Sequence, residues 1–314
     1  MLAPKLTPGD IIGVVSPSSP VEQDNRQLAS GIRFLVSMGF KVILGEHVFS
    51  NSLGYPQKNG GYAASPTEKA ADLMRMFGDP AVKAIICSQG GDTANACLSY
   101  LDWQVIRDNP KIFLGISDIT VLLNAINTKT GLITFHGNDV MWGFGRHPTA
   151  YDREEFLDRL VEGKIGRVNA LGTRKTMRNG RAEGRLLGGN LRCLLKLAGT
   201  PYFPDFSEAI LFIESLGFEP PACDYMFRQL QQMGVFDQIR GVIVGYIDGV
   251  DNLPEATLHM EDVLLTVTQD YHFPILKAND FGHNTPNTTL PVGGRVRMQA
   301  DEKEIEIVEE CLNH

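Results

Sequence analysis

Residues 111–120 read KIFLGISDIT, an apolar run that ends at Gly115 and places Ser117 directly before a helical pattern. A buried strand followed at once by a helix is the repeating unit of a parallel sheet. The same change recurs along the chain and predicts strands at 11–17, 41–48, 82–91, 111–117, 131–139, 209–215, 241–249 and 274–283. We therefore expect an α/β protein built on largely parallel sheets.

The length of the chain predicts two domains. At 314 residues it exceeds the size at which a single hydrophobic core usually stops growing. Residues 163–185 are basic, rich in glycine and poorly periodic, so we interpret them as a linker or mobile loop. An N-terminal parallel-sheet domain would then span 1–162 and a C-terminal α/β domain 186–314. The tail, GRVRMQADEKEIEIVEE (294–310), alternates at period two around a polar turn and predicts a hairpin.

Composition and charge exclude several classes of protein. The net charge of −8 and the pI near 5.4 disfavour binding to nucleic acid, which needs clustered Lys and Arg. The five cysteines are widely spaced without a C-x-x-C pair, so we expect a reducing compartment. No apolar run has the length of a secretory h-region at the start or of a membrane span later. The protein is therefore expected in the cytoplasm, without a membrane partner.

Polar side chains at the ends of predicted strands are the first candidates for chemistry, because ligands of parallel sheets gather at these ends. Ser117 follows KIFLGI, Glu214 ends AILFIE, and His283 follows PILKANDFG. A serine hydroxyl needs a base to activate it, and the base needs a carboxylate to orient it and stabilise its charge. These three residues supply those roles, with His136 in TFHGND as the rival base. The histidines show no metal-ligand spacing, so we predict neither a metal nor a cofactor.

Ser117 has two interpretations that the sequence leaves open. Serine is a favoured N-cap residue, and SDITVLLNAI is a helix that it could cap. Alternatively it is a nucleophile presented at the end of a strand. The two roles are compatible, because backbone N–H groups at a helix start can also hold an oxyanion. The glycine two residues after the serine of the usual nucleophile elbow is missing here.

The segment SQGGDTANA (88–96) is the second informative stretch. Paired glycines at the end of a buried strand let the backbone approach a ligand and direct N–H groups at negative charge. The backbone near Gly91 could thus form an oxyanion hole with the Asp118 N–H. A tight turn without this function is the alternative. The letters are also similar to the GGDGT phosphate loop of lipid and NAD kinases, although no G-K-[ST] sequence accompanies them.

Taken together, several segments resemble the LD-carboxypeptidase family of serine peptidases, which includes murein tetrapeptide carboxypeptidases and microcin C immunity peptidases. The segments are LTPGDIIGVVSPSSP (6–20), SQGGDTANACLSYLDW (88–103), NPKIFLGISDITVLLNAI (109–126), AEGRLLGGNL (182–191), ILFIES (210–215) and FGHNTPNTTLPVG (281–293). The resemblance implies a nucleophile domain followed by a C-terminal domain that carries acid and base. It assigns the nucleophile to Ser117, the acid to Glu214, the base to His283 and the oxyanion donors to Gly91 and Asp118.

The resemblance also implies an activity. We expect hydrolysis of an amide next to a free carboxylate, at the bond that releases D-alanine from a murein tetrapeptide, by a homodimer acting on small peptides. The microcin-type members cut an aminoacyl-nucleotide conjugate and carry aromatic residues in a long interdomain loop, whereas residues 163–185 contain no Trp, Tyr or Phe. A nucleotide-dependent kinase and a non-catalytic ligand-binding protein are the alternatives from other classes. Candidates for binding the substrate carboxylate are Arg185, Arg192 and Arg228, which the sequence does not rank.

Overall fold

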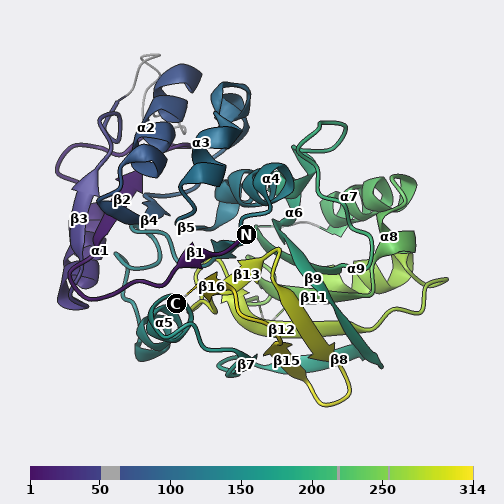
Figure 1. The fold of residues 1–314 in the computed structure, drawn as a ribbon. Helices are drawn as coiled ribbons and strands as arrows, with labels where there is room; N and C mark the ends of the chain where they lie inside the picture. Colours follow the sequence, from purple (N-terminus) through teal and green to yellow (C-terminus); the bar gives the residue numbers. More distant parts are fainter. Residues whose placement is uncertain (51–63, 218–219, 254, 314) are drawn as a thin grey trace.

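The protein consists of two lobes, each built around one sheet. The computed structural model describes residues 1–50, 64–217, 220–253 and 255–313. In Figure 1 the purple and blue N-terminal part forms one lobe, and the green and yellow C-terminal part forms the other. This architecture confirms the expected α/β fold class with two domains.

The first sheet has the strand order β13-β6-β5-β4-β2-β3. Its neighbouring strands pair in parallel except for β13, which pairs antiparallel to β6. The strands are β2 (Ile11–Val15), β3 (Lys41–Leu44), β4 (Val82–Cys87), β5 (Ile112–Gly115), β6 (Thr134–His136) and β13 (Leu290–Val292). The helical segments of this half are α1 (Arg26–Ser37), α2 (Pro66–Gly78), η2 (Ala94–Tyr100), α3 (Trp103–Asp108), η3 (Ser117–Ile119), α4 (Thr120–Thr130), α5 (Ala150–Phe156) and η4 (Leu157–Val161).

Local sequence signals explain where these helices begin. In α2 the Ser65 hydroxyl accepts from the Glu68 N–H, the Glu68 carboxylate accepts from the Ser65 N–H, and Pro66 takes the first helical position. In α1 the side chain of Asn25 accepts from two backbone N–H groups of the first turn. These caps fix the helices that cover the first sheet.

The second sheet has the strand order β7-β15-β14-β9-β10-β11-β12-β8. Its centre, β9 to β12, is parallel, and the strands outside it are antiparallel. The strands are β7 (Gly166–Arg167), β8 (Arg174–Arg178), β9 (Arg181–Asn190), β10 (Ile210–Leu216), β11 (Gly241–Asp248), β12 (Ile275–Gly282), β14 (Arg295–Gln299) and β15 (Glu304–Ile307). Its helices are α6 (Leu191–Leu195), α7 (Pro220–Gln232), α8 (Val235–Gln238) and α9 (Met260–Val267). The predicted C-terminal hairpin is confirmed as β14 and β15.

The stretch 163–185 differs from the linker or loop that we predicted. It contains β7, β8 and the first half of β9, which belong to the second sheet. The period-two signal is weak because β8 lies at a sheet edge, where most of its side chains are half-buried or exposed. The Asp280 carboxylate of β12 holds this stretch through the N–H groups of Leu171 and Gly172. The domain boundaries of 1–162 and 186–314 stay a prediction.

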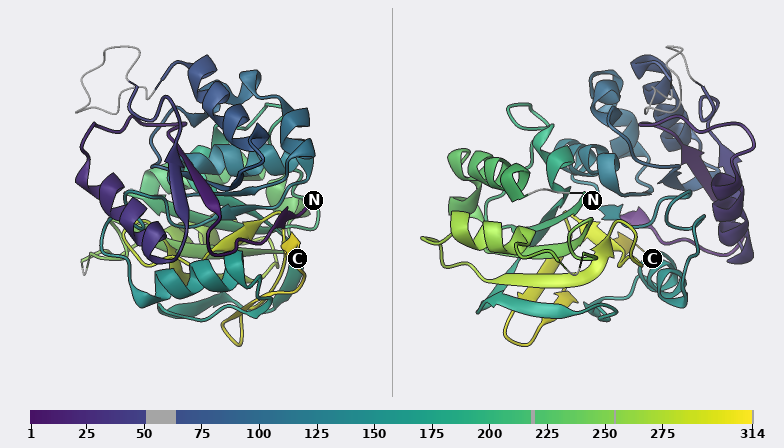
Figure 2. Two further views of the ribbon diagram at one scale, coloured as in Figure 1. Left: turned by 60° about the vertical axis from the view of Figure 1, so that its left-hand side comes forward. Right: turned by 180° about the vertical axis from the view of Figure 1, so that it is seen from behind.

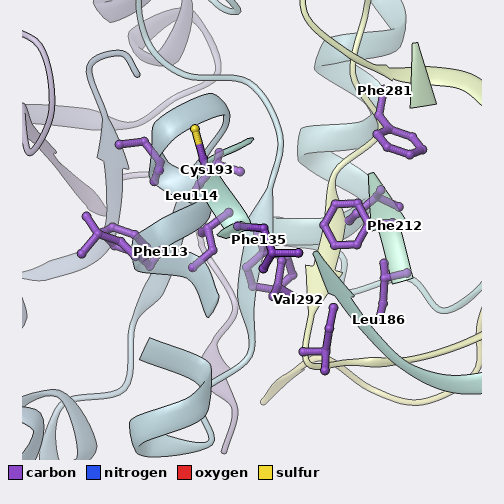
Figure 3. Packing of buried hydrophobic residues seen from close by; sticks show 14 of the residues in the cluster. Phe113, Leu114, Phe135, Leu186, Cys193, Phe212, Phe281 and Val292 are labelled. Carbon is purple, nitrogen blue, oxygen red and sulfur yellow. The ribbon is translucent and has the colours of Figure 1, made fainter. Parts of the chain in front are cut away.

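The two lobes share strands and one core. Strand β13 of the C-terminal half joins the first sheet, and β1 (Ala3–Pro4) pairs in parallel with β16 (Leu312–Asn313). Figure 2 shows from two further sides that both chain ends lie where the lobes meet. In Figure 3, Phe113 of β5 lies on one side, Phe212 of β10 on the other, and Phe135 and Val292 between them. Among the described residues, no helix has the length and apolar character needed to cross a membrane.

Candidate active site

A cavity of about 780 Å³ opens between the two lobes. Its lining comes from the ends of β9 and β10 and from the loops that follow β2, β4, β5, β6 and β12. These are the carboxyl ends of parallel strands, where α/β proteins bind their ligands. Ser117 and His283 both line this cavity, and Glu214 is fully buried behind it. The fold therefore brings the three candidates from separate strands to one region.

Ser117 occupies a strained turn between β5 and α4. Its φ of 65° lies in the left-handed region, which non-glycine residues rarely adopt and which concentrates at functional sites. Ser117 begins the single turn η3, α4 begins at Thr120, and neither start has a side-chain cap hydrogen bond. The N-cap alternative for Ser117 is therefore wrong. Its hydroxyl has no hydrogen-bond partner among the described residues, and it lines the cavity.

The glycine pair of SQGGDTANA lies beside Ser117 and the loop after β2, with Gly90 directly against Ser117. A Cβ added to Gly90 would lie 2.6 Å from Ser117 Cβ and 2.8 Å from Ser117 Oγ. Gly91 has a φ of 143°, and a Cβ there would lie 2.1 Å from the Ser19 hydroxyl. Only glycine fits both positions without displacement of a neighbour. In the part of the chain that the structure describes, the Gly91 amide donates to no protein acceptor.

The Asp118 carboxylate ties the turn to its surroundings. It is fully buried, and its Oδ2 accepts from the Ser18 hydroxyl at 2.6 Å and from the Ala94 N–H at 2.7 Å. Its Oδ1 accepts from the Lys196 ammonium at 2.6 Å. One carboxylate thus joins the loop after β2 and the start of η2 to Lys196, which caps the C-terminus of α6 in the other half. The sequence indicated only the backbone N–H of Asp118 and not this role, because the partners of the carboxylate are far away in the chain.

Glu214 and His283 form a hydrogen-bonded pair from two strands. His283 Nδ1 lies 2.6 Å from Glu214 Oε2. Burial alone would raise the pKa of Glu214, but the charge of His283 and this hydrogen bond outweigh it, so the pKa lies below its ordinary value. Burial alone would lower the pKa of His283, but the Glu214 charge and hydrogen bond raise it above its usual 6.5. This is the geometry of a base oriented by a carboxylate.

His136, the rival base, lies in a different environment. Its ring is fully buried, with its centroid 5.2 Å from that of Phe212 and 6.0 Å from that of Phe281. Burial lowers the pKa of His136 to about 4, so it is neutral near pH 7. It does not line the cavity, whereas His283 does. The structure therefore favours His283 as the base.

Two family models match the chain. The LD-carboxypeptidase N-terminal domain matches residues 12–137, and the LD-carboxypeptidase C-terminal domain matches residues 183–298. The chain belongs to the LD-carboxypeptidase family. This membership confirms the resemblance drawn from the sequence. It also confirms the expected class of enzyme, a serine-type carboxypeptidase, in preference to a nucleotide-dependent kinase or a non-catalytic binding protein.

Proteins with different names are similar to the chain over almost its whole length. A protein of Bacillus subtilis named as a probable murein peptide carboxypeptidase is 34% identical over 95% of this chain and 91% of its own. The microcin C7 self-immunity protein MccF of Escherichia coli is 32% identical over 100% of this chain and 97% of its own length. The solved structure of MccF in complex with aspartyl sulfamoyl adenosine superposes with a TM-score of 0.90 at 28% identity, covering 100% of both chains. A muramoyltetrapeptide carboxypeptidase from Oxalobacter formigenes superposes with a TM-score of 0.77 at 25% identity. The superposition covers 94% of this chain and 97% of the other.

The structure separates the arginines that the sequence could not rank. Arg192 lines the cavity of this LD-carboxypeptidase, whereas Arg185 bonds to the Asp205 carbonyl and Arg228 pairs with Asp224 on exposed surface outside it. Arg146 also lines the cavity, although the sequence did not indicate it. Its segment, WGFGRHP, has no periodic pattern and follows no strand directly, so no local signal indicates its position.

One group of side chains in the described part of the chain has the arrangement of a metal site, away from the cavity. Ligand atoms of Asp251, His259 and Glu261 lie within 4.8 Å of one another. The Lys277 ammonium lies 2.5 Å from Asp251 Oδ2 and 3.5 Å from Glu261 Oε2. A buried lysine thus already supplies the positive charge that these carboxylates need. The prediction of a site without metal or cofactor stays a prediction.

The Gly90→Ala variant should lose activity without losing its fold. The new methyl would overlap Ser117 Cβ and Oγ and force the side chain out of its position. Because a displacement of about 1 Å can cost roughly 10²-fold in rate, we expect kcat to fall by about that factor. Peptide hydrolysis measures the loss, and circular dichroism checks the fold.

Gly78→Ala is the matched control, because a Cβ at Gly78 meets nothing within 4 Å. This variant should retain the wild-type rate. Full activity of Gly90→Ala would show that Ser117 needs no such close backbone neighbour.

Proposed function

We propose that the protein is a serine carboxypeptidase that hydrolyses an amide next to a free carboxylate, releasing D-alanine from a murein tetrapeptide. The observation that carries this proposal is the Glu214–His283 pair, which lies beside the same cavity as the strained Ser117. Ser117 Oγ attacks the carbonyl carbon, and His283 takes the hydroxyl proton. Glu214 holds the imidazole in the required tautomer and stabilises its positive charge.

The tetrahedral intermediate needs donors for its oxyanion. We assign them to the backbone N–H groups of Gly91, which follows the Gly90 that packs against Ser117, and of Asp118, which follows Ser117 itself. Each such donor contributes about 3 to 4 kcal/mol in a comparable site. His283 then returns its proton to the leaving amine, and water hydrolyses the acyl-enzyme in a second step that uses the same base.

The choice of substrate is supported by the relatives and by the interdomain stretch. The B. subtilis relative and the O. formigenes structure carry names of murein peptide carboxypeptidases. The stretch 163–185 has no aromatic side chain with which to stack a nucleobase.

An aminoacyl-nucleotide conjugate is the second candidate substrate. The superposition on MccF, with a TM-score of 0.90, is closer than that on the muramoyltetrapeptide carboxypeptidase. In addition, the cavity contains Trp142, a large aromatic side chain that is 48% exposed. This ring could stack on a base in place of an aromatic loop.

A substrate panel tests the proposal. The protein is incubated with murein tetrapeptides and with an aminoacyl sulfamoyl adenosine, and the products are identified by mass spectrometry. We expect release of D-alanine from the tetrapeptide, with a kcat/KM at least about tenfold above that for the nucleoside conjugate, a difference of about 1.4 kcal/mol in transition-state binding. Release of the nucleoside alone would replace the proposed substrate with the second candidate. Absence of both reactions would contradict the proposed activity.

We further infer a cytoplasmic homodimer that needs neither nucleic acid nor membrane. All five cysteines are buried thiols without a disulfide, which supports a reducing compartment. The formal charge of −8 supports the absence of a nucleic-acid partner. Light scattering coupled to size-exclusion chromatography would measure the oligomeric state.

A further inference from the structure

We infer that Arg146 binds the carboxylate of the amino acid that leaves, and that this contact makes the enzyme a carboxypeptidase. The inference rests on the proposed function and adds the residue that selects the free chain end. No motif of the sequence indicates Arg146, and its role follows from where three cavity residues place it.

Contacts at one wall of the cavity hold Arg146 in position. Its guanidinium carbon lies 5.7 Å from the centroid of the Trp142 ring, and its Nη1 donates to Asn284 Oδ1 at 3.0 Å. The Trp142 indole N–H donates to Gln89 Oε1 at 3.0 Å, next to the glycine pair. A continuous wall therefore runs from Gln89 through Trp142 and Arg146 to Asn284, and this packing reduces the freedom that Arg146 loses on binding.

The position next to the base decides which part of the substrate Arg146 meets. In the second half of acylation, His283 gives its proton to the leaving nitrogen, so this nitrogen lies beside the imidazole. In an amino acid the carboxylate carbon is only about 2.5 Å from its own nitrogen. The carboxylate of the leaving residue must therefore lie close to His283. Arg146 lies nearby, because its guanidinium donates a hydrogen bond to Asn284, the residue that directly follows His283.

The charge of Arg146 is available to a ligand. Within the described residues it forms no ion pair, and one of its five N–H donors is used by Asn284. The Asp139 carboxylate in the same cavity accepts from the backbone N–H groups of Trp142 and Gly143. The Asp152 carboxylate likewise accepts from Thr149 and from other protein donors. A guanidinium with its remaining donors unpaired fits a carboxylate in a bidentate arrangement.

Arg192, the other arginine of the cavity, belongs to α6, which contacts the turn η3 that begins at Ser117. It precedes Lys196 by four positions in and after α6, which places the two on one helix face. The Lys196 ammonium bonds to Asp118, the neighbour of the nucleophile. Arg192 therefore lies on the side of the cavity that carries Ser117, whereas Arg146 contacts the residue that follows His283.

The test compares a murein tetrapeptide ending in D-alanine with the same peptide ending in D-alaninamide. For the wild type we expect kcat/KM to favour the free carboxylate by about 10- to 100-fold, the range of one charge-assisted bidentate contact. In Arg146→Gln this ratio should fall to within about threefold, mainly through KM, with Arg146→Lys in between. The rate at which a fluorophosphonate labels Ser117 should stay at the wild-type level, because that reagent has no terminal carboxylate.

Arg228→Gln is the control, since it removes an exposed arginine outside the cavity and should leave both kcat/KM values unchanged. If Arg146→Gln hydrolyses the tetrapeptide and keeps the wild-type ratio of kcat/KM between the two peptides, the inference is overturned while the proposed function stands. A loss of the ratio in Arg192→Gln but not in Arg146→Gln overturns it as well. If the wild type releases neither D-alanine from the first peptide nor D-alaninamide from the second, although Ser117 is labelled, the proposed function fails and the inference with it.

Discussion

Replacing Ser117 by alanine is expected to reduce peptide hydrolysis by about 10⁵- to 10⁶-fold, the loss found when a serine nucleophile is removed from a catalytic triad. Alanine keeps the Cβ, so the backbone at φ 65° carries the same strain as in the wild type. The Ser117 hydroxyl makes no hydrogen bond within the described residues, so its removal costs no protein contact. The melting temperature should therefore stay close to that of the wild type while kcat falls to background.

Ser99→Ala is the matched control for this variant, because Ser99 is an exposed serine on η2 at a distance from the cavity. It should hydrolyse the tetrapeptide at the wild-type rate. A fluorophosphonate should add to the wild type and to Ser99→Ala at one site, and not to Ser117→Ala. Should Ser117→Ala retain more than about 1% of the wild-type kcat, well above the residual catalysis of a triad without its nucleophile, another group would be the nucleophile.

The strands could be predicted from the sequence because their apolar runs are buried on both faces. Runs such as VKAIIC and IFLG keep almost every side chain inside the sheet, and the prediction depends on burial alone. The candidate acid and base followed from the same logic, since the carboxyl ends of parallel strands meet at one edge. These inferences need no knowledge of which strands are neighbours.

Two edge strands, β8 and β13, could not be predicted, because their pairing partners decide them. β8 reads RKTMR and is held by β12, about 100 residues later in the chain. β13 is a three-residue strand that leaves its own half to pair with β6. The sequence within each strand contains too little information for such non-local pairing, so 163–185 had the composition of a linker.

The fold gives the physical reason for the choice between the histidines. His136 and His283 both follow apolar runs, and it is the family resemblance that assigns the base to His283 at the level of sequence. The three-dimensional arrangement separates them, because Phe212 and Phe281 enclose the ring of His136 while Glu214 bonds to His283. Arg146 is a similar case, since its neighbours Trp142 and Asn284 come together only after the lobes have packed.

The Glu214→Gln variant should lower kcat by about 10⁴-fold, as loss of the carboxylate does in other triads. A glutamine amide that donates to His283 Nδ1 stabilises the wrong tautomer of the ring, and it offers no charge to the imidazolium.

The same change should move the pH profile of kcat/KM. In the wild type the pKa of His283 is raised above 6.5, so kcat/KM should increase with pH to a midpoint above that value as the base loses its proton.

In Glu214→Gln the midpoint should fall, because the charge that raises the pKa of His283 is gone while burial continues to lower it. The carboxylates of Asp139 and Asp248 also raise the pKa of His283, and both remain in the variant. The pKa of His283 should therefore fall by less than it would if all three carboxylates were removed. When the pH is lowered below 6.5, kcat/KM of the variant should consequently decrease by a smaller factor than kcat/KM of the wild type. Glu208→Gln, which changes an exposed glutamate paired with Arg240, should keep the wild-type midpoint and rate. A midpoint that stays in place or rises in Glu214→Gln would mean that the ionisation governing activity belongs to a group other than the Glu214–His283 pair.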